Sequence, residues 1–198
     1  DHKRRYDGSL VNELSPRVAL ILLQPKWDLK FSYSKSFVDA PYLYRKTNDF
    51  LPYIQGEETE LMQLKSETVH SLQLTFAAHE WFKGFNFEIN GFYNRANDLI
   101  ITHIIDYNNG GLNKTAGLEL MASYRRPRFT ADFNLSYIKT FKSRLFNSAS
   151  DLILLFDQDI EIPYVTTGID DNNNTPHVMA NAVLSWQVTK RLNLHTHL

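Results

Sequence analysis

The sequence predicts an all-β fold, an antiparallel up-and-down transmembrane β-barrel present as about eight strands of a larger barrel. Three observations favour this fold class. Long segments alternate apolar and polar residues, as strands with one apolar and one polar face do. Short turns and long loops alternate along the chain. Trp27, Trp81, Phe82 and Trp186 lie at or near the short turns, where an aromatic girdle would meet the membrane interface.

Composition argues against several other classes of protein. The 198 residues carry a formal net charge of −1 and no cysteine, which gives no reason to expect a nucleic-acid partner or a disulfide framework. No apolar run approaches the roughly 18 residues of a transmembrane helix, the longest being 18–23. No segment shows a sustained 3.6-residue periodicity, so none is assigned to a helix. The chain opens on Asp1 without a signal-peptide pattern, and we expect a fragment of a longer protein.

Four strands are predicted in the first half of the chain, over residues 16–24, 27–37, 69–78 and 84–97. The first is apolar on both faces, whereas the other three alternate. Tight turns join the strands within each pair. A long connection, 38–68, separates the two pairs; it contains Pro41 and Pro52, which favour a loop.

Four more strands are predicted over residues 115–125, 129–141, 176–188 and from 192 into the end of the chain. The segment 129–141 is the clearest, since its odd positions up to 137 are apolar and its even positions up to 136 are Thr, Asp, Asn and Ser. It exceeds the roughly 5–6 residues of a typical globular strand and suits a tilted membrane strand of about 9–11. The turn-prone run 108–111 predicts a loop between residues 97 and 115, and the longest loop is expected over 142–175.

Periodicity alone does not separate a membrane barrel from a soluble β-sandwich, because both alternate inward and outward side chains. A soluble all-β carbohydrate-binding module is therefore the main alternative. A small closed barrel of eight strands, acting as an adhesin or an enzyme, is a third.

Four stretches in chain order carry a family resemblance. They are Leu14–Ala19 continuing through Trp27–Lys30 and Tyr33–Phe37 to Ala40–Pro41, then Leu64–Ser71, Asn90–Ile100 and Thr115–Leu120. Together they resemble the C-terminal part of TonB-dependent outer-membrane receptors, the active transporters of Gram-negative bacteria. Ser66 stands where the family pattern has proline, and Asp39 departs from the usual spacing before Ala40. The charge-rich loops suit a Bacteroides-like receptor.

The resemblance implies that residues 1–198 form part of a barrel of about 22 strands, with the plug domain and the terminal strand outside this sequence. It implies an outer-membrane location and active uptake of a siderophore, haem, cobalamin or an oligosaccharide. The implied partners are the TonB complex, reached through the plug, outer-membrane lipid, the transported ligand and a surface lipoprotein. It implies no enzymatic activity, cofactor or nucleic acid.

Aromatic residues in the long connections are the candidate ligand contacts. We single out Tyr42, Tyr44, Tyr53, Phe156 and Tyr164, whose rings could stack on a sugar or a siderophore. The alternative for each is that it packs one loop against another.

Weaker candidates for a metal site are Asp157, Asp159 and Glu161, which share a face if their segment is extended and would suit Ca²⁺. No EF-hand spacing is present, and a solvated acidic loop is the favoured interpretation. His195 and His197 are expected on one strand facing the lumen, where ordinary polar lining residues are favoured over metal ligands. No catalytic motif is recognised.

Overall fold

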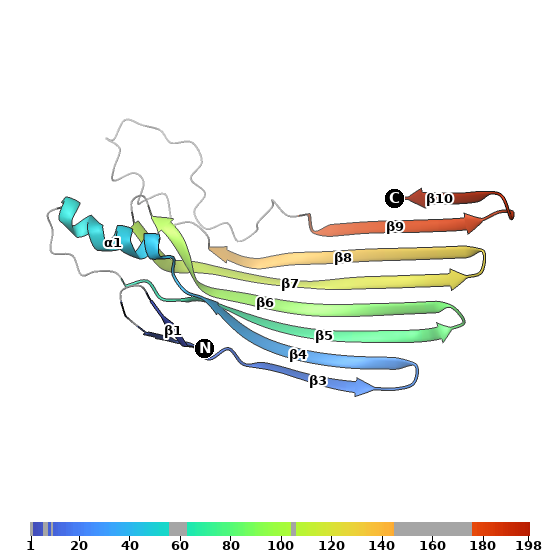
Figure 1. Cartoon of the computed structure of the whole chain (residues 1–198), viewed down its shortest axis with the longest axis horizontal. Helices are drawn as coiled ribbons and strands as arrows, with labels where there is room; N and C mark the ends of the chain where they lie inside the picture. The colour runs from blue at the N-terminus through green and yellow to red at the C-terminus, as the bar shows by residue number, and fades with distance from the viewer. Residues whose placement is uncertain (1, 6–7, 9, 56–62, 104–105, 145–175) are drawn as a thin grey trace, which may run out of the picture.

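The computed structural model describes the chain except for residues 1, 6–7, 9, 56–62, 104–105 and 145–175. Its centre is an antiparallel sheet of eight strands in the order β10-β9-β8-β7-β6-β5-β4-β3, so each strand pairs with its neighbours in sequence (Figure 1). Such a meander is the up-and-down topology, and it confirms the predicted fold class.

The strands of this sheet are longer than the sequence predicts at several ends. They are β3 (Arg17–Leu23), β4 (Trp27–Val38), β5 (Glu67–Phe82), β6 (Phe85–His103), β7 (Asp106–Arg126), β8 (Phe129–Arg144), β9 (Val178–Gln187) and β10 (Asn193–His197). A separate two-stranded sheet, which the sequence did not predict, pairs β1 (His2–Arg4) with β2 (Leu10–Asn12).

The prediction that a short connection follows every second strand is confirmed, whereas the connections between these are not all long, because β6 ends at His103 and β7 begins at Asp106. Residues 24–26, 83–84, 127–128 and 188–192 make the predicted short connections, and all of them lie at one end of the sheet (Figure 1). We call this the short-turn end. The helix α1 (Tyr42–Gln55) and the β1–β2 hairpin lie at the opposite end, the loop end.

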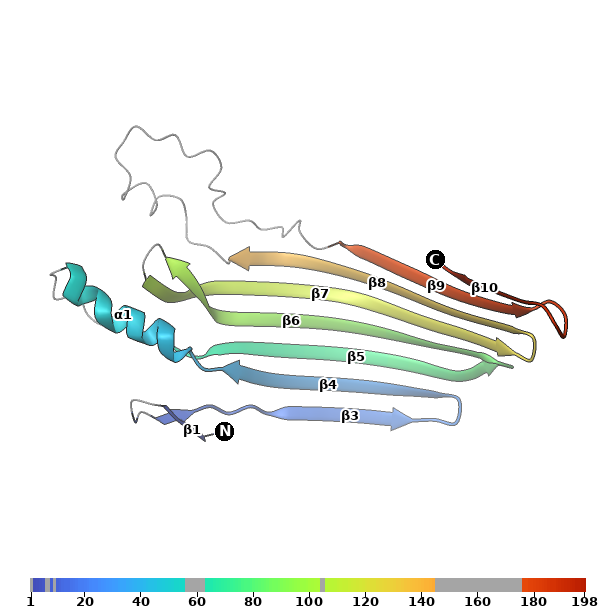
Figure 2. The same cartoon turned by 45° about the horizontal axis from the view of Figure 1, so that its top comes forward.

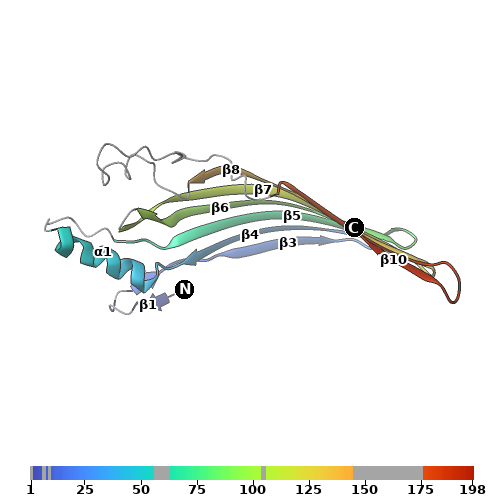
Figure 3. The same cartoon turned by 90° about the horizontal axis from the view of Figure 1, so that it is seen from above.

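The sheet is one curved layer, which Figure 3 shows closer to edge-on, and in neither turned view does a second large sheet of described residues lie against it (Figures 2 and 3). Few apolar side chains of the described residues are buried: Val11, Ala40, Leu64, Ala77, Ala78 and Ile101. None of the large side chains in the described part is fully buried. The sheet therefore has no dry interior of the kind that a two-layer β-sandwich forms between its sheets.

The helix α1 corrects the prediction of an irregular connection over 38–68. The backbone N–H of Arg45 donates to the carbonyl of Pro41 at 3.3 Å where the helix begins, and the helix continues through Pro52. Proline is tolerated at the start of a helix but breaks hydrogen bonding inside one, which is why two prolines favoured a loop. Among the described residues, no helix is long and apolar enough to cross a membrane.

The loop predicted between residues 97 and 115 is also wrong, because β6 and β7 continue through it. Register shifts at Asn97/Leu99 and Leu99/Ile101 mark irregularities in the pairing there. Gly111 sits so close to β6 that a Cβ atom at its position would lie 2.5 Å from the Cβ of Leu99. Gly111, which resembled a turn residue, thus permits a close approach of two strands.

Candidate functional site

The sheet presents two chemically different faces. Residues that pair across antiparallel strands point to the same side, so each row of partners belongs to one face. The row Leu20, Phe31, Leu74, Gly91, Leu118 and Tyr137 lies on what we call the apolar face. The neighbouring row Ile21, Lys30, Thr75, Asn90, Glu119 and Ser136 lies on the polar face. The alternation seen in the sequence therefore extends in register across the sheet.

Hydrogen bonds between side chains join the strands on the polar face. The hydroxyl of Thr75 donates to Asn90 Oδ1 at 3.0 Å, and Asn90 Nδ2 donates to Glu119 Oε2 at 3.0 Å, so one chain of bonds links β5, β6 and β7. Ser71 Oγ lies 2.7 Å from Asn94 Oδ1 on the same face. These groups are partly buried and satisfied, which is what polar side chains need where bulk water is restricted.

Aromatic rings gather on the apolar face at the short-turn end, as the sequence predicts. Phe82 stacks on Phe85 with centroids 4.6 Å apart, and Tyr124 lies 6.1 Å from the ring of Phe129. Trp186 pairs in register with Phe129 and is 52% exposed. Aromatic rings in this position match the interfacial girdle of a membrane barrel.

At the loop end, α1 is fastened to β7 by one buried asparagine. Asn48 Nδ2 donates to the carbonyl of Tyr107 at 2.7 Å, and the Tyr107 N–H donates to Asn48 Oδ1 at 2.8 Å. Tyr44, one helical turn earlier, stacks its ring on that of Tyr107 with centroids 4.0 Å apart. The helix is therefore held by two contacts at positions i and i+4 on the same side.

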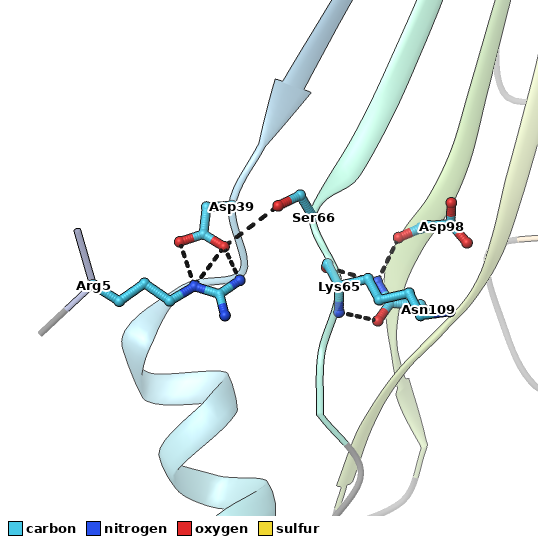
Figure 4. A network of polar contacts seen from close by, with 6 residues as sticks. All are labelled: Arg5, Asp39, Lys65, Ser66, Asp98 and Asn109. Atoms are coloured by element: carbon cyan, nitrogen blue, oxygen red, sulfur yellow. Dashed lines mark hydrogen bonds and ion pairs between the residues drawn. The ribbon is translucent and has the colours of Figure 1, made fainter. Parts of the chain in front are cut away.

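A second cluster joins the β1–β2 hairpin to the sheet at the loop end (Figure 4). Arg5 Nε donates to both carboxylate oxygens of Asp39 at 3.1 Å, and its Nη2 lies 2.5 Å from Asp39 Oδ1. The Asp39 side chain is 1% exposed. Ser66 Oγ approaches the same carboxylate at 3.5 Å. The two residues that depart from the family pattern, Asp39 and Ser66, thus lie against each other.

Asn109 ties β7 to the segment that enters β5 (Figure 4). Its Oδ1 accepts from the Lys65 N–H at 2.7 Å, and its Nδ2 donates to the carbonyls of Lys65 at 3.0 Å and Asp98 at 2.7 Å. Three hydrogen bonds of this side chain thus hold the loop end together.

The five predicted ligand contacts fall in different places. Tyr42 lies at the start of α1 with 47% of its surface exposed, and Lys46 Nζ lies 5.8 Å from its ring centroid. Tyr44 is the half-buried ring that stacks on Tyr107. Tyr53 belongs to the last turns of α1, while Phe156 and Tyr164 lie outside the described residues.

The metal candidates Asp157, Asp159 and Glu161 also lie outside the described residues. Within the described part of the chain, no three His, Cys, Asp or Glu side chains come together in a metal-binding group. His195 Nδ1 lies 2.6 Å from Ser185 Oγ on the polar face, where it takes part in a hydrogen bond between β9 and β10.

Sequence reasoning missed Asn48 and Tyr107, which position α1. Neither belongs to a recognisable motif, because 59 residues separate them in the chain. The Asn109–Lys65 contact joins residues 44 apart and was equally inaccessible to local patterns.

Comparison with known proteins agrees with this architecture. The family model described as TonB dependent receptor-like, beta-barrel matches residues 1–195. The FrpB iron transporter from Neisseria meningitidis superposes with a TM-score of 0.60 at 17% identity, covering 99% of this chain and 28% of that one. The ferric-catecholate import receptor Fiu from E. coli gives 0.60 at 10% identity, covering 96% and 26%.

No curated protein matches the chain. The chain spans little more than a quarter of the length of the two solved structures. At these identities the structural likeness concerns the fold alone. The family match over nearly all residues, together with the meander and its two faces, shows that this chain belongs to the TonB-dependent receptors and forms part of the β-barrel in the outer membrane.

Proposed function

We propose that this chain is a section of wall and loops in a receptor that takes up a scarce nutrient across the outer membrane with energy delivered through TonB. The observation that carries the proposal is the pairing of an exposed apolar face with a hydrogen-bonded polar face on one meander of strands. Such a wall separates lipid from a water-accessible lumen. It binds, encloses and passes a ligand, and it performs no bond-making chemistry.

The polar face would supply the lumen lining. The chain of bonds from Thr75 through Asn90 to Glu119 would form part of the polar surface that meets a plug domain or a passing solute. The apolar face would meet the acyl chains, with Leu74 and Leu118 each about half exposed. Both assignments follow from matching each face to the solvent that stabilises it.

The ligand class proposed for the first test is a ferric siderophore. Its support is that one similar solved structure is named an iron transporter and another a ferric-catecholate import receptor. Haem, cobalamin and oligosaccharides are the competing ligands in the same experiment.

A soluble carbohydrate-binding module is the alternative function. It would bury the apolar face against a second sheet. In the described residues that face carries large exposed side chains instead, among them Leu20 at 66% and Leu74 at 51%. Extraction distinguishes the two: the barrel protein needs detergent to leave the membrane fraction, whereas a soluble module does not.

Uptake by the intact receptor tests the proposal directly. The complete protein that carries this chain is expressed in a Gram-negative host lacking its own ferric-siderophore receptors, and uptake of radiolabelled iron chelates is measured. We expect accumulation that stops when TonB is deleted or the proton gradient is dissipated. Uptake that persists without TonB would overturn the proposed mechanism, and TonB-dependent uptake of another ligand would overturn only the ligand class.

Tyr42 is the proposed ligand contact that the structure lets us test with a matched control. Tyr42→Ala removes a ring that is 47% exposed at the loop end, whereas Tyr44→Ala removes a ring stacked on Tyr107. We expect Tyr42→Ala to weaken ligand binding without changing stability and Tyr44→Ala to loosen α1. Unchanged affinity in Tyr42→Ala would remove this residue from the site.

A further inference from the structure

A row of basic side chains crosses five strands on the apolar face near the loop end. The register pairs Lys35 with His70, His70 with Arg95, Arg95 with Lys114, and Lys114 with Lys142. We call these five residues the basic row. Each strand from β4 to β8 contributes one member, and none of the five positions holds an acidic residue.

The basic row belongs to the apolar face, because each of its members on β4, β5 and β6 lies two positions along the strand from a residue of the last apolar row. Tyr33, Leu72 and Tyr93 form that preceding row. Side chains two residues apart on a strand point to the same side. On β8, a register shift after Lys114 brings Lys142 rather than its neighbour Phe141 into line.

Among the described residues, the acidic neighbours of the basic row pair with only part of its charge. Lys35 Nζ is paired with Glu13 at 3.2 Å, and His70 Nδ1 lies 2.9 Å from the Tyr33 hydroxyl. Arg95 is exposed and uses its Nε to donate to the neutral Asn97 at 2.7 Å. Lys142 is exposed as well. Because few acidic partners lie along the basic row in the described residues, it can bind an external anion.

The row also borders a hollow in the apolar face. A groove of about 710 Å³ is lined by Tyr33, His70, Leu72, Tyr93, Arg95 and Asp98, among others. It combines a cationic edge with apolar walls. Asp98 is the one acidic side chain among its lining residues.

The position of the basic row along the strands matches the surface of a membrane. From Trp27 to Lys35 is eight residues and from Phe85 to Arg95 is ten. At about 3.3 Å per residue and a strand tilt of about 40°, these lengths span about 20–25 Å along the membrane normal. The apolar band of a membrane barrel is about 25 Å tall. The basic row is therefore one band height from the aromatic girdle, at the level of lipid headgroups.

We propose that the basic row and its groove bind the phosphorylated headgroup of a lipid in the outer leaflet, with the acyl chains lying on the apolar face below. The guanidinium of Arg95 suits bidentate contact with a phosphate, and Lys114 and Lys142 add point charges beside it. Tyr33 and Tyr93 then sit at the boundary between headgroup and chains. This site faces away from the lumen, so it is independent of the transported ligand.

The test compares two triple variants of the intact receptor in mild detergent. The first, Arg95→Gln with Lys114→Gln and Lys142→Gln, removes three charges from the basic row. The control, Lys83→Gln with Arg128→Gln and Lys190→Gln, removes three charges at the short-turn end, where all three residues are exposed. Each is titrated with diphosphorylated lipid A, and the bound lipid is counted by native mass spectrometry.

We expect the first variant to bind about 100-fold more weakly, because each cation near a charged lipid surface contributes about a fivefold factor. The control should stay within about twofold of the original protein. Equal affinity in the two variants, or an equal loss, would overturn the proposal. If the first variant kept its affinity for lipid A but lost binding of an acidic surface protein, the basic row would serve a protein partner. That result would also overturn the proposal.

Two measurements on the unaltered receptor keep the test decisive if the first variant fails to fold. Enzymatically dephosphorylated lipid A should bind far more weakly than the diphosphorylated form, and raising NaCl from about 0.05 to about 0.5 M should weaken binding of the latter. Inorganic phosphate should not displace lipid A, since it lacks acyl chains. Equal binding of both lipids, or ready displacement by inorganic phosphate, would overturn a headgroup site.

Discussion

The two faces of the sheet use the same backbone but achieve stability in different ways. On the apolar face, Leu74 and Leu118 are about half exposed. On the polar face, Asn90 is held between Thr75 and Glu119 by hydrogen bonds of 3.0 Å. The apolar face should therefore tolerate changes of shape but not of polarity, and the polar face the reverse.

The largest expected effect comes from placing a charge on the apolar face. Leu118→Arg inserts a cation midway between the aromatic rings and the basic row, and we expect a loss of about 2–4 kcal/mol in the free energy of unfolding. Ser136→Arg, at a polar-face position one row away, should cost less than about 0.5 kcal/mol. Urea unfolding of the intact receptor in lipid vesicles measures both. Similar losses in the two variants would contradict the assignment of the faces.

A methyl group tests the tolerance to shape. A Cβ at Gly117, on the polar face, would lie 2.5 Å from Phe92 Cζ and 2.6 Å from the Tyr137 carbonyl oxygen. Gly117→Ala should therefore cost about 1–3 kcal/mol through forced movement of backbone. Gly91 on the apolar face meets nothing closer than 4.0 Å, so Gly91→Ala should change stability by less than about 1 kcal/mol. The same unfolding assay ranks them, and equal costs would mean that the polar face is less tightly packed than its contacts indicate.

On the polar face, the loss in the free energy of unfolding should increase with the number of hydrogen bonds that a truncated side chain makes. Asn90→Ala leaves Thr75 and Glu119 without their shared partner, and we expect a loss of about 1–2 kcal/mol. Asn134→Ala breaks a single exposed bond to Asn181 and should cost about 0.5 kcal/mol. Hydrogen exchange of the amides in β5 to β7 should accelerate only in the first variant. Acceleration in neither would show that the backbone ladder alone holds these strands.

The smallest effect is expected from the ion pair between Arg125 and Asp132. Its atoms are 2.9 Å apart, but the side chains are 62% and 40% exposed. Arg125→Gln should therefore change the unfolding free energy by less than about 0.5 kcal/mol, and less still at high salt. A larger loss that salt does not reduce would indicate that this end of the sheet is more shielded from water than its exposure implies.

The meander was predictable because its information is local. The alternation of apolar and polar residues in segments such as 129–141 specifies a strand. The short connection after every second strand specifies antiparallel hairpins, and hence the up-and-down order. The helix α1 was not predictable in the same way. Residues 42–55 do carry an amphipathic pattern, but Pro52 within the segment argued against a helix. The contact that holds the helix in place, from Asn48 to Tyr107 on β7, joins distant parts of the chain and leaves no local signal.

The candidate site also combines features that the local sequence predicts with features that depend on contacts between distant residues. The aromatic loop residues could be named from their chemistry, but the sequence could not tell that Tyr44 packs against Tyr107 while Tyr42 stays exposed. The basic row escaped notice because its members are spread from Lys35 to Lys142 and become neighbours only through register. Charge patterns along a chain reveal helical faces more readily than rows across a sheet.

The outermost strands, β3 and β10, each have a hydrogen-bonded neighbour on one side only in the described residues. In hydrocarbon, an unpaired amide or carbonyl costs several kcal/mol, and a whole strand margin carries many such groups. Both edges of such a sheet can therefore pair with another chain. We expect residues 1–198 produced alone to self-associate in water rather than remain monomeric. Its stability in a bilayer depends on further strands that pair with β3 and β10 and close the barrel. The curvature of the sheet alone does not satisfy these edges.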